Sequence, residues 1–408
     1  MKDIIKIEID NFGPINHADI NIGELNVIGG LNGTGKSTAS KLMYCFLKSV
    51  SSKRQIFYLE QNLGKINYVI RELNRCSDLF EYKRLNIADG FDYILDEFYD
   101  TYAVFKSNSY DFEDEHVLKM KMDELWDTIN MILDNGNQLY ESIFQLLLNT
   151  EFSSELMGKV IFSSLNESFK YNLNFKNSIW DDGVFNNFGR FNINDVFYID
   201  SISNLDLFRI RIKPPEHIEY LGKNIKWNAD QSGEISSKEN KIIHHLEKRI
   251  TNIINGNFNP KNFKFTQDDG KEVSVINTSS GTKQIGIIQL LLSNRKLRNS
   301  TFLIIDEPEV NLHPEWQIKL AEILVLLVKE LHIIVYINSH SPMFIEAMSI
   351  FSEYYSLKDE TNIYLTKKQG NGFTFEKIAN DDMGAIYENL SRPYDDLDKI
   401  KAELLFRK

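Results

Sequence analysis

The stretch "VIGGLNGTGKSTASKL", Val27 to Leu42, decides how the rest of this chain is interpreted. Its centre, Gly30 to Ser37, fits the pattern G-x-x-x-x-G-K-[ST] and follows an apolar run that is typical of a buried strand. The residues after the loop have helical periodicity, with an apolar side made by Leu42, Met43 and Phe46. A strand, a glycine-rich loop and a helix in this order predict a site for nucleotide phosphates.

The residue types in the loop explain how it would bind phosphate. Glycines permit positive φ angles and let backbone N–H groups point at phosphate oxygens. Lys36 adds a charge for the β and γ phosphates, Ser37 offers a hydroxyl to Mg²⁺, and the helix directs its N-terminal dipole at the anion. We therefore expect ATP and Mg²⁺ as ligands. The nucleotide-binding residues predicted here are Asn32, Gly33, Gly35, Lys36, Ser37 and Thr38.

A second motif, "FLIIDEP" at Phe302 to Pro308, ends an apolar strand in two carboxylates. Such a strand would deliver Asp306 to its C-terminal end beside the phosphates. There Asp306 can contact the bound nucleotide and coordinate Mg²⁺. Glu307 would then have the reach to orient or deprotonate the attacking water, which makes it a candidate catalytic base. Strands that end in Asp-Glu are common by chance, so this motif indicates a nucleotide site only in combination with the phosphate loop.

Two further motifs extend the series. His340 in "YINSHSP" follows the next apolar strand, where it could hydrogen-bond the γ-phosphate and the attacking water as a second catalytic residue. For His244, His245 and His332 we keep the simpler interpretation of ordinary surface or core histidines. The segment "SSGTKQ", Ser279 to Gln284, heads a helix, and its small residues suit either an anion site or an ordinary N-cap.

Taken in order, the four motifs resemble those of ABC-type ATPases, and more closely the branch of SMC and RecF heads and OLD-like bacterial ATPases. "NFGPI" followed by "LNVIGGLNGTGKST" looks like the start of that branch, and "SSGTKQ" looks like its signature motif. "DEPEVNLHP" is similar to its joined Walker B and D-loop, and "NSHSP" to its switch histidine. The resemblance covers about residues 1–50 and 195–370. It departs at Thr282, where many relatives have glycine, and around Asp200 and Ser201, where the Q-loop glutamine is missing.

This resemblance implies a head-to-tail homodimer that forms around ATP. In it, Ser280 and Gly281 of one copy would cap the γ-phosphate held by Lys36 of the other. It also implies an adenine site near the turn between the first two strands, with Asn11 and Phe12 as candidates. The D-loop would comprise Asn311, Leu312 and His313.

The predicted fold class is α/β, an ABC-type P-loop ATPase head with a large helical insertion between Walker A and the signature motif. We assign the head to residues 1–52 and 193–378 and the insertion, which has mostly helical periodicity, to residues 53–192. Residues 379–408 are predicted to form short helices that close the head. Strands are expected at "DVFYIDS" and at a hairpin with Asp-Gly in its turn.

Composition narrows the function classes. The chain has 408 residues, an apolar fraction of 42% and a net charge of −12, which argues against a wholly basic nucleic-acid binder. Two cysteines, Cys45 and Cys76, are too few for a disulfide framework. No run of eighteen apolar residues and no signal-like start occur, so we expect a cytoplasmic protein without a membrane partner.

Three functions stay open at this point. The first is an ATP-gated regulator or sensor in bacterial anti-phage defence, similar to stand-alone Septu- or PARIS-type ATPases, with a nuclease- or toxin-like effector on a separate chain. The second is a RecF-like DNA repair ATPase, for which nucleic acid would be a partner. Its support is thin: the alternating Arg209, Arg211 and Lys213, and the run from Asn294 to Asn299, which we interpret as a solvated helix end. The third, a transporter subunit, fits the long insertion poorly, and a GTPase or kinase lacks the required motifs.

Overall fold

The computed structural model describes residues 5–76, 85, 91–107, 115–133, 137–152, 157–163, 170–176, 179–180, 193–200, 214–226, 237–380, 382–390 and 392–406. The chain divides into two compact units. The first, called the head, comprises Met1–Leu47 and Leu147–Lys408, and the second, called the helical unit, comprises Lys48–Leu146.

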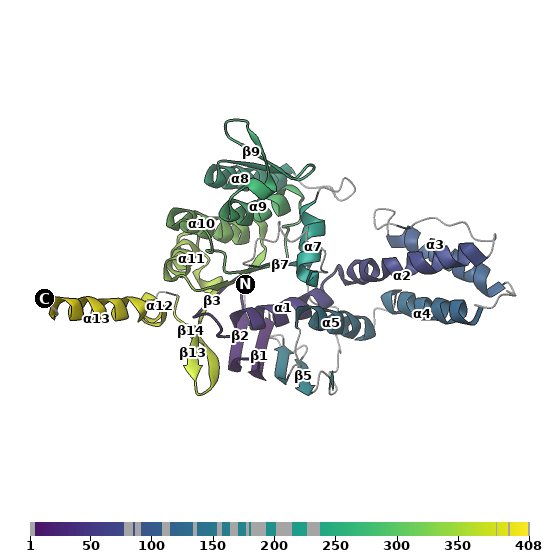
Figure 1. Ribbon diagram of the computed structural model, residues 1–408, viewed down its shortest axis with the longest axis horizontal. Helices are drawn as coiled ribbons and strands as arrows, with labels where there is room; N and C mark the ends of the chain where they lie inside the picture. The colour runs from purple at the N-terminus through teal and green to yellow at the C-terminus, as the bar shows by residue number, and fades with distance from the viewer. Residues whose placement is uncertain are drawn as a thin grey trace. The chain divides into compact units, whose positions relative to one another are not determined.

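The head is built on one large mixed sheet (Figure 1). Its strand order is β6-β5-β4-β1-β2-β14-β13-β3-β12-β11-β7, and it is accompanied by helices, so the predicted α/β class is confirmed. The strands are β1 (Ile5–Phe12), β2 (Ile15–Ile22), β3 (Leu25–Gly29), β4 (Gly158–Ser163), β5 (Lys170–Lys176), β6 (Ile179–Trp180), β7 (Asp195–Ile199), β11 (Thr301–Asp306), β12 (Ile334–Ser339), β13 (Thr361–Gln369) and β14 (Gly372–Ile378).

Five neighbouring strands, β7, β11, β12, β3 and β13, run parallel. Every residue of β3, β7, β11 and β12 is buried, which explains their nearly continuous apolar sequences. Because the carboxyl ends of parallel strands lie along one edge of a sheet, the residues that follow these strands gather there. This edge therefore collects the phosphate loop after β3, Glu307 after β11 and His340 after β12.

The other part of the sheet includes strands from the segment that the sequence assigned to a helical insertion. Strand β4 is antiparallel to β1, with Ile7 opposite Phe162, and β5 and β6 follow β4. The structure thus differs from the predicted insertion limits of 53–192, since the compact helical unit ends at Leu146. Strand β4 has only six residues, and its buried positions are consecutive, so its sequence shows no strand alternation. Its place in the sheet depends on pairing with β1, which lies far earlier in the chain.

Several helices of the head pack against one another. Helix α10 packs against α11 and α8, and α8 packs against α9. A small antiparallel sheet beside them consists of β8 (Gly256–Asn259), β9 (Lys264–Gln267) and β10 (Glu272–Ser274), with the predicted Asp-Gly turn between β9 and β10. The helices are α1 (Lys36–Val50), α7 (Glu216–Ile225), α8 (Ser237–Ile254), α9 (Ser280–Ser293), α10 (Pro314–Leu331), α11 (Pro342–Tyr354), α12 (Met383–Leu390) and α13 (Arg392–Phe406), with 3-10 turns at Val275–Asn277 and Lys358–Glu360.

The helical unit has a core of its own. It contains α2 (Arg54–Cys76), α3 (Phe91–Ser107), α4 (Glu115–Leu133) and the first part of α5 (Asn137–Glu151). The apolar positions that recur with helical spacing in the sequence are buried in this core, among them Leu59, Ile66 and Ile70 of α2 and Met122, Leu125 and Ile129 of α4. The side chain of Trp126 stacks on Tyr102 with ring centroids 4.1 Å apart.

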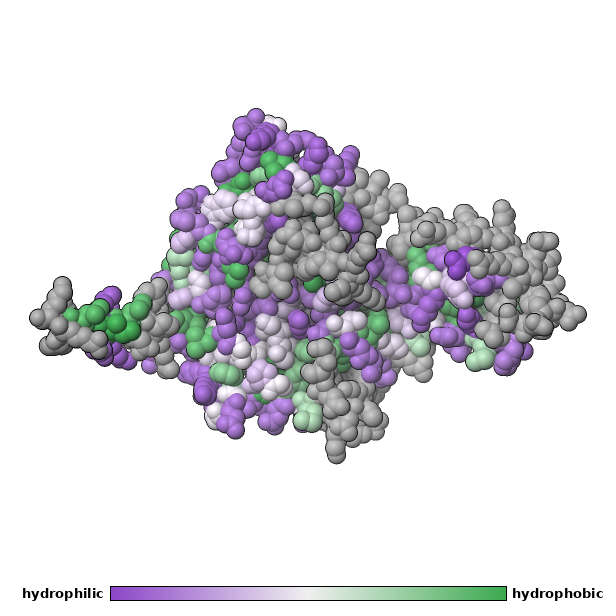
Figure 2. Space-filling view, viewed as in Figure 1, coloured by the Kyte–Doolittle hydropathy of each residue, from purple (hydrophilic) through white to green (hydrophobic). Residues whose placement is uncertain are grey.

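The C-terminal helices differ from one another. Helix α12 packs on α11 and buries Ile386 and Leu390. The apolar side chains of α13, in contrast, are more than half exposed at Leu397, Ile400 and Leu404, and they form a green stripe in Figure 2. Within the described part of the chain, no helix combines the length and the hydropathy needed to cross a membrane.

Candidate nucleotide site

The predicted phosphate loop encloses a small cavity at the edge of the parallel strands. Its volume is about 170 Å³, and the loop residues from Asn32 to Thr38 line it together with Pro14 and Glu307. All six loop residues predicted to bind the nucleotide are thus brought together, and the predicted base faces them.

Glycines are required at two positions of this cavity. Gly33 and Gly35 have φ angles of 75° and 95°, which residues with a Cβ rarely adopt. A Cβ at Gly35 would also lie 2.5 Å from Cγ1 of Ile15. The backbone conformation therefore favours glycine at both positions, and at Gly35 a side chain would also clash with Ile15.

Lys36 crosses the loop from the first turn of α1. It is 4% exposed, and its Nζ donates hydrogen bonds to the carbonyl oxygens of Gly30 and Leu31, each at 2.8 Å. Burial lowers the pKa of Lys36, and the carboxylates of Asp306, Glu307 and Glu309 partly offset this effect. The three acids therefore lie within electrostatic reach of the ammonium group.

Asp306 ends β11 and is fixed by hydrogen bonds on both carboxylate oxygens. Asn338 Nδ2 donates to Oδ1 at 3.0 Å, and the hydroxyl of Tyr198 donates to Oδ2 at 3.3 Å. Ser40 of α1 joins the same network through Tyr198 and Asn338. The strand sequences alone gave no sign of this support, because its members come from four separate elements.

Glu307 follows β11 in the left-handed region, with a φ of 53°. Its backbone N–H donates to Asn338 O, and its carbonyl accepts from Gln284 Nε2 of α9. Burial raises the pKa of the Glu307 carboxyl, and the nearby acids Asp306 and Glu309 add to this while His340 opposes it. A raised pKa suits a general base that must accept a proton near neutral pH. Unusual backbone angles are also concentrated at functional sites.

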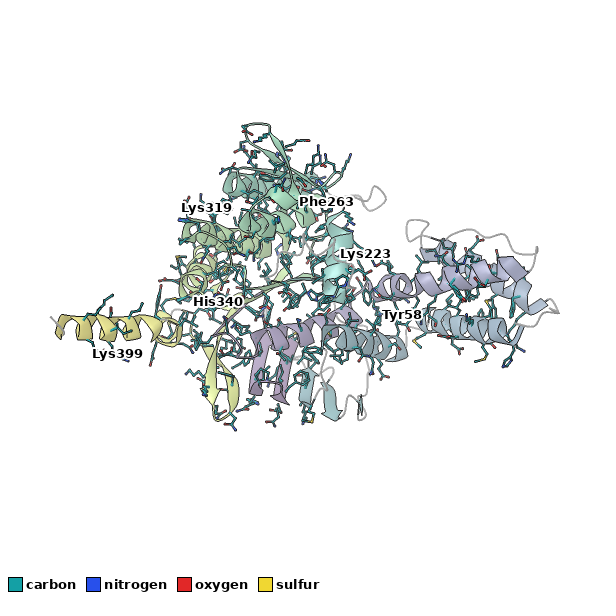
Figure 3. The ribbon with its side chains drawn as sticks, in the orientation of Figure 1. Tyr58, Lys223, Phe263, Lys319, His340 and Lys399 are labelled. Atoms are coloured by element: carbon teal, nitrogen blue, oxygen red, sulfur yellow. The ribbon has the colours of Figure 1, made fainter. Side chains whose placement is uncertain are left out.

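His340 lies just after β12 and is labelled in Figure 3. Its Nδ1 is 3.7 Å from Glu307 Oε1 and 3.2 Å from Glu309 Oε1. The predicted pair of Glu307 and His340 therefore does meet at the edge of the sheet. Glu309, which the sequence analysis did not single out, is a third member of the group.

Ser280 and Gly281 do not line this cavity. They begin α9, where Ser279 is the N-cap and its side chain accepts a hydrogen bond from the N–H of Thr282. Ser280 is exposed, whereas Gly281 is buried, and a Cβ at Gly281 would lie 2.7 Å from Asn311 O. The motif thus rests on the D-loop segment of the same chain and presents Ser280 to the surface.

The residues predicted for the adenine site and the Q-loop differ in burial and in contacts. Phe12 is 1% exposed and packs edge-on against Phe152, so its ring presents no free face to a base. Asn11 is exposed at the strand turn and stays a candidate. Asp200 follows β7, where its carboxylate lies 3.8 Å from Nε2 of His217, and Ser201 is outside the described residues.

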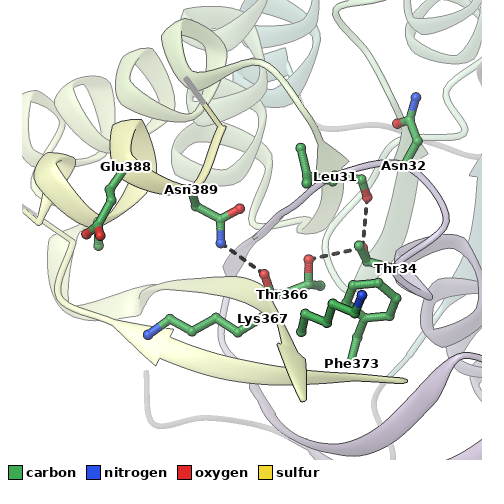
Figure 4. A pocket seen from close by; sticks show the side chains of 10 residues that line it. Leu31, Asn32, Thr34, Thr366, Lys367, Phe373, Glu388 and Asn389 are labelled. Atoms are coloured by element: carbon green, nitrogen blue, oxygen red, sulfur yellow. Dashed lines mark hydrogen bonds between the residues drawn. The ribbon is translucent and has the colours of Figure 1, made fainter. Parts of the chain in front are cut away.

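A larger cavity of about 530 Å³ adjoins the outer side of the phosphate loop (Figure 4). Thr366 of β13 links the two, because its hydroxyl is 3.0 Å from that of Thr34 and its carbonyl accepts from Asn389 of α12. The Thr34 hydroxyl in turn donates to Leu31 O. Helix α12 is therefore connected to the phosphate loop through two threonines.

The basic run from Asn294 to Asn299 is folded into the head. It follows α9, but Lys296 is only 7% exposed, Leu297 is fully buried, and Arg298 Nε donates to Arg295 O. The prediction of a solvated helix end is wrong in this respect, since the turn is anchored by backbone contacts that a sequence pattern does not reveal. Arg209, Arg211 and Lys213 lie outside the described residues.

The residues at this edge fit a nucleoside triphosphate and a divalent cation. Gly35 lets the loop lie close to Ile15, where a Cβ would clash, and Lys36 brings a positive charge to the cavity lining. Ser37 and Asp306 supply oxygen ligands of the kind that Mg²⁺ prefers alongside phosphate oxygens and water.

Solved structures with similarity to this chain include the SMC head domain from Thermotoga maritima, which is 11% identical over 93% of this chain and 99% of that chain, with a TM-score of 0.37. Another is cbiO1 from Clostridium perfringens, part of the ABC transporter complex cbiONQ, at 14% identity over 98% and 100% of the chains and a TM-score of 0.37. No curated protein matches the sequence.

A family model decides the assignment. The model of the AAA ATPase domain matches residues 1–345, which includes the phosphate loop, the signature segment, Asp306, Glu307 and His340. The chain therefore belongs to the AAA ATPase domain family and is an ATPase of that family.

Proposed function

We propose that this protein is an ABC-type ATPase that closes as a head-to-tail homodimer around ATP and thereby controls a separate effector. The observation that carries the proposal is the separation of Ser280 from the phosphate cavity of its own chain. The residue is exposed at the N-terminus of a fourteen-residue helix, where N–H groups and the helix dipole favour an anion. A second copy can supply that anion as the γ-phosphate of its own ATP.

Within each site the residues have distinct tasks. Lys36 and the loop backbone hold the β and γ phosphates, and Ser37 and Asp306 hold Mg²⁺, which neutralises charge on the phosphates when bound. Glu307 accepts a proton from the attacking water or orients it, and His340 hydrogen-bonds the same water. Asn338 and Tyr198 fix the Asp306 carboxylate, so that little reorganisation is needed when the metal and nucleotide bind.

The biological setting we propose is bacterial anti-phage defence. It rests on the motif resemblance to stand-alone ATPases of such systems, and the effector would be a nuclease- or toxin-like protein on another chain. The helical unit, with its separate core, is a suitable element to report the closed state to that effector. The DNA repair alternative loses some support because Lys296 is buried in a turn.

The test is whether the protein dimerises when ATP binds, as measured by light scattering. Glu307→Gln should bind ATP without hydrolysing it and should double its mass from 47.5 kDa when ATP and Mg²⁺ are added. Ser280→Arg in the same background should bind ATP and stay monomeric, because a long cation blocks the exposed helix start. Ser356→Arg, at another exposed serine, is the matched control and should still dimerise.

Two results would contradict the proposal. One is an ATP-saturated Glu307→Gln protein that stays monomeric at all concentrations tested. The other is a Ser280→Arg variant that dimerises as readily as the Ser356→Arg control.

A further inference from the structure

Glu309 is a buried carboxylate that the proposed mechanism has not used. It is 4% exposed, it lies three residues after Asp306, and it does not line the phosphate cavity. Burying a carboxylate is costly unless hydrogen bonds compensate for the lost water. The contacts of Glu309 should therefore reveal why a charged side chain stands here.

Almost all of these contacts go to the segment that carries His340. One carboxylate oxygen, Oε1, accepts from Ser339 Oγ at 2.8 Å, from His340 N at 2.7 Å and from Ser341 N at 3.1 Å. Three donors from consecutive residues thus converge on one atom. Charge-assisted hydrogen bonds of this kind are about twice as strong as neutral ones. The backbone on both sides of the histidine is consequently fixed by Glu309.

The side chains also face each other. His340 Nδ1 lies 3.2 Å from Glu309 Oε1, within ion-pair distance. Yet among the described residues neither His340 Nδ1 nor the second oxygen, Glu309 Oε2, has a hydrogen-bond partner, and both atoms are buried. Leaving a buried polar atom without a partner destabilises the fold. The imidazole and the carboxylate are therefore neighbours at a place where a hydrogen bond between them would be favourable.

We propose that Glu309 is a positioning residue, which orients the His340 ring for its contact with the attacking water. The inference rests on the proposed role of His340 in hydrolysis. Nδ1 donates to the carboxylate beside it when it carries the ring proton, and Nε2 of the neutral ring is then an acceptor that can receive a hydrogen bond from the attacking water. Glu309 thus acts through His340 and touches neither the phosphates nor the attacking water.

The first experiment compares Glu309→Gln with Glu322→Gln. Glutamine keeps an oxygen that can accept the backbone N–H groups, so the fold is spared while the charge beside Nδ1 is lost. Glu322 is a matched control because its carboxylate is also engaged, with Arg249 and Tyr355, but away from His340. We expect kcat of Glu309→Gln to fall about 10-fold or more, as for carboxylates that orient functional histidines. The KM for ATP should stay within about 3-fold, and the control should match the wild-type protein.

A double-mutant cycle separates positioning from a general structural effect. If Glu309 acts through His340, the double variant Glu309→Gln/His340→Ala should have the kcat of His340→Ala alone, within about 2-fold. Losses that multiply, or an unchanged kcat in Glu309→Gln, would overturn the inference. So would a His340→Ala variant that keeps its kcat while Glu309→Gln loses it.

A second measurement does not depend on hydrolysis. The ring ¹⁵N shifts of histidine report which nitrogen carries the proton, and the signals of His340 can be assigned among eight histidines by their loss in His340→Ala. Glu309→Gln should move these signals, and Glu322→Gln should leave them unchanged. Unchanged signals in Glu309→Gln would refute the inference. A wild-type protein that does not hydrolyse ATP would instead refute the proposed function, and the ring signals would still decide whether Glu309 controls the histidine.

Discussion

Single residues at the sheet edge show how burial shapes the chemistry of the phosphate loop. Lys36 is almost fully buried, its pKa is lowered by burial, and its ammonium is hydrogen-bonded to two loop carbonyls. An ammonium fixed in this way needs only a small change of partners to contact a phosphate oxygen. Preorganisation of this kind strengthens binding, because the side chain is already ordered before the nucleotide arrives.

Replacing this lysine should abolish tight nucleotide binding. Lys36→Ala should weaken ATP affinity at least about 10-fold, because a charge-assisted hydrogen bond contributes about 1.5–3 kcal/mol. The measurement is calorimetric titration with ATP and Mg²⁺. Lys41→Ala, on the same helix and outside the cavity lining, should bind as the wild-type protein does. Equal affinities for the two variants would show that the loop is not the nucleotide site.

At the scale of elements, close packing between helices and strands depends on particular small residues. Gly286 of α9 lies against Phe258 of β8, and a Cβ there would be 2.1 Å from the ring. Gly64 of α2 has no heavy atom within 4 Å of its would-be Cβ. The same residue type therefore serves packing in one helix and has no packing role in the other.

The two glycines should respond oppositely to alanine. Gly286→Ala should lower the free energy of unfolding of the head by about 1–3 kcal/mol, since overpacking exceeds the gain in helix propensity. Gly64→Ala should raise the stability of the helical unit by about 0.5–1 kcal/mol, because alanine reduces the flexibility of the unfolded chain. Urea denaturation of both variants checks this, and a stabilised Gly286→Ala would contradict the packing of α9 on β8.

A buried ion pair also joins elements of the head. Glu151 at the end of α5 accepts from His217 Nδ1 of α7 at 2.6 Å, and Asp200 after β7 lies 3.8 Å from the other ring nitrogen. Burial by itself lowers the pKa of His217, but the two carboxylates outweigh it, so the pKa is raised above 6.5. The folded head therefore binds this proton more tightly than the unfolded chain does.

This pair predicts a pH dependence of stability. Its contribution is fully present below pH 6.5, the unfolded value, and is lost as the pH rises through the raised pKa of the folded state. Urea denaturation between pH 6 and pH 9 should show the difference in unfolding free energy between the wild-type protein and His217→Gln shrinking with pH. His245→Gln, at an exposed histidine, should show no such trend. A difference that grows with pH would contradict the buried pair.

For the whole molecule, the chain contains two separate cores. The helical unit is centred on residues such as Ile129, and the head on the parallel strands, for example Ile337 of β12; both side chains are fully buried. Since each unit buries its own apolar surface, a defect in one should leave the other largely intact.

Hydrogen exchange with mass spectrometry can test this independence. Ile129→Ala should destabilise the helical unit by about 2–5 kcal/mol and speed exchange there, while ATP affinity changes less than about 2-fold. Ile337→Ala should speed exchange in the strands of the head and weaken ATP binding. Faster exchange throughout the chain in Ile129→Ala would show that the two cores unfold as one.

The sequence by itself determined the parts of the site that local pattern controls. The spacing from Gly30 to Ser37 predicted the loop, and the apolar runs before Asp306 and His340 predicted parallel strands whose ends meet. These inferences hold because a buried strand needs apolar residues, and parallel strands place their carboxyl ends at one edge. They did not depend on which distant segments make contact.

Only the tertiary structure decided the features that arise between distant segments. Glu309 meets the residues of the His340 loop about thirty positions away, Tyr198 supports Asp306 from another strand, and β4 joins β1 within the sheet. Phe12 proved to be buried by Phe152, and Lys296 was enclosed in a turn. Burial and hydrogen bonding at such positions depend on what the folded chain brings alongside, and no local periodicity encodes that.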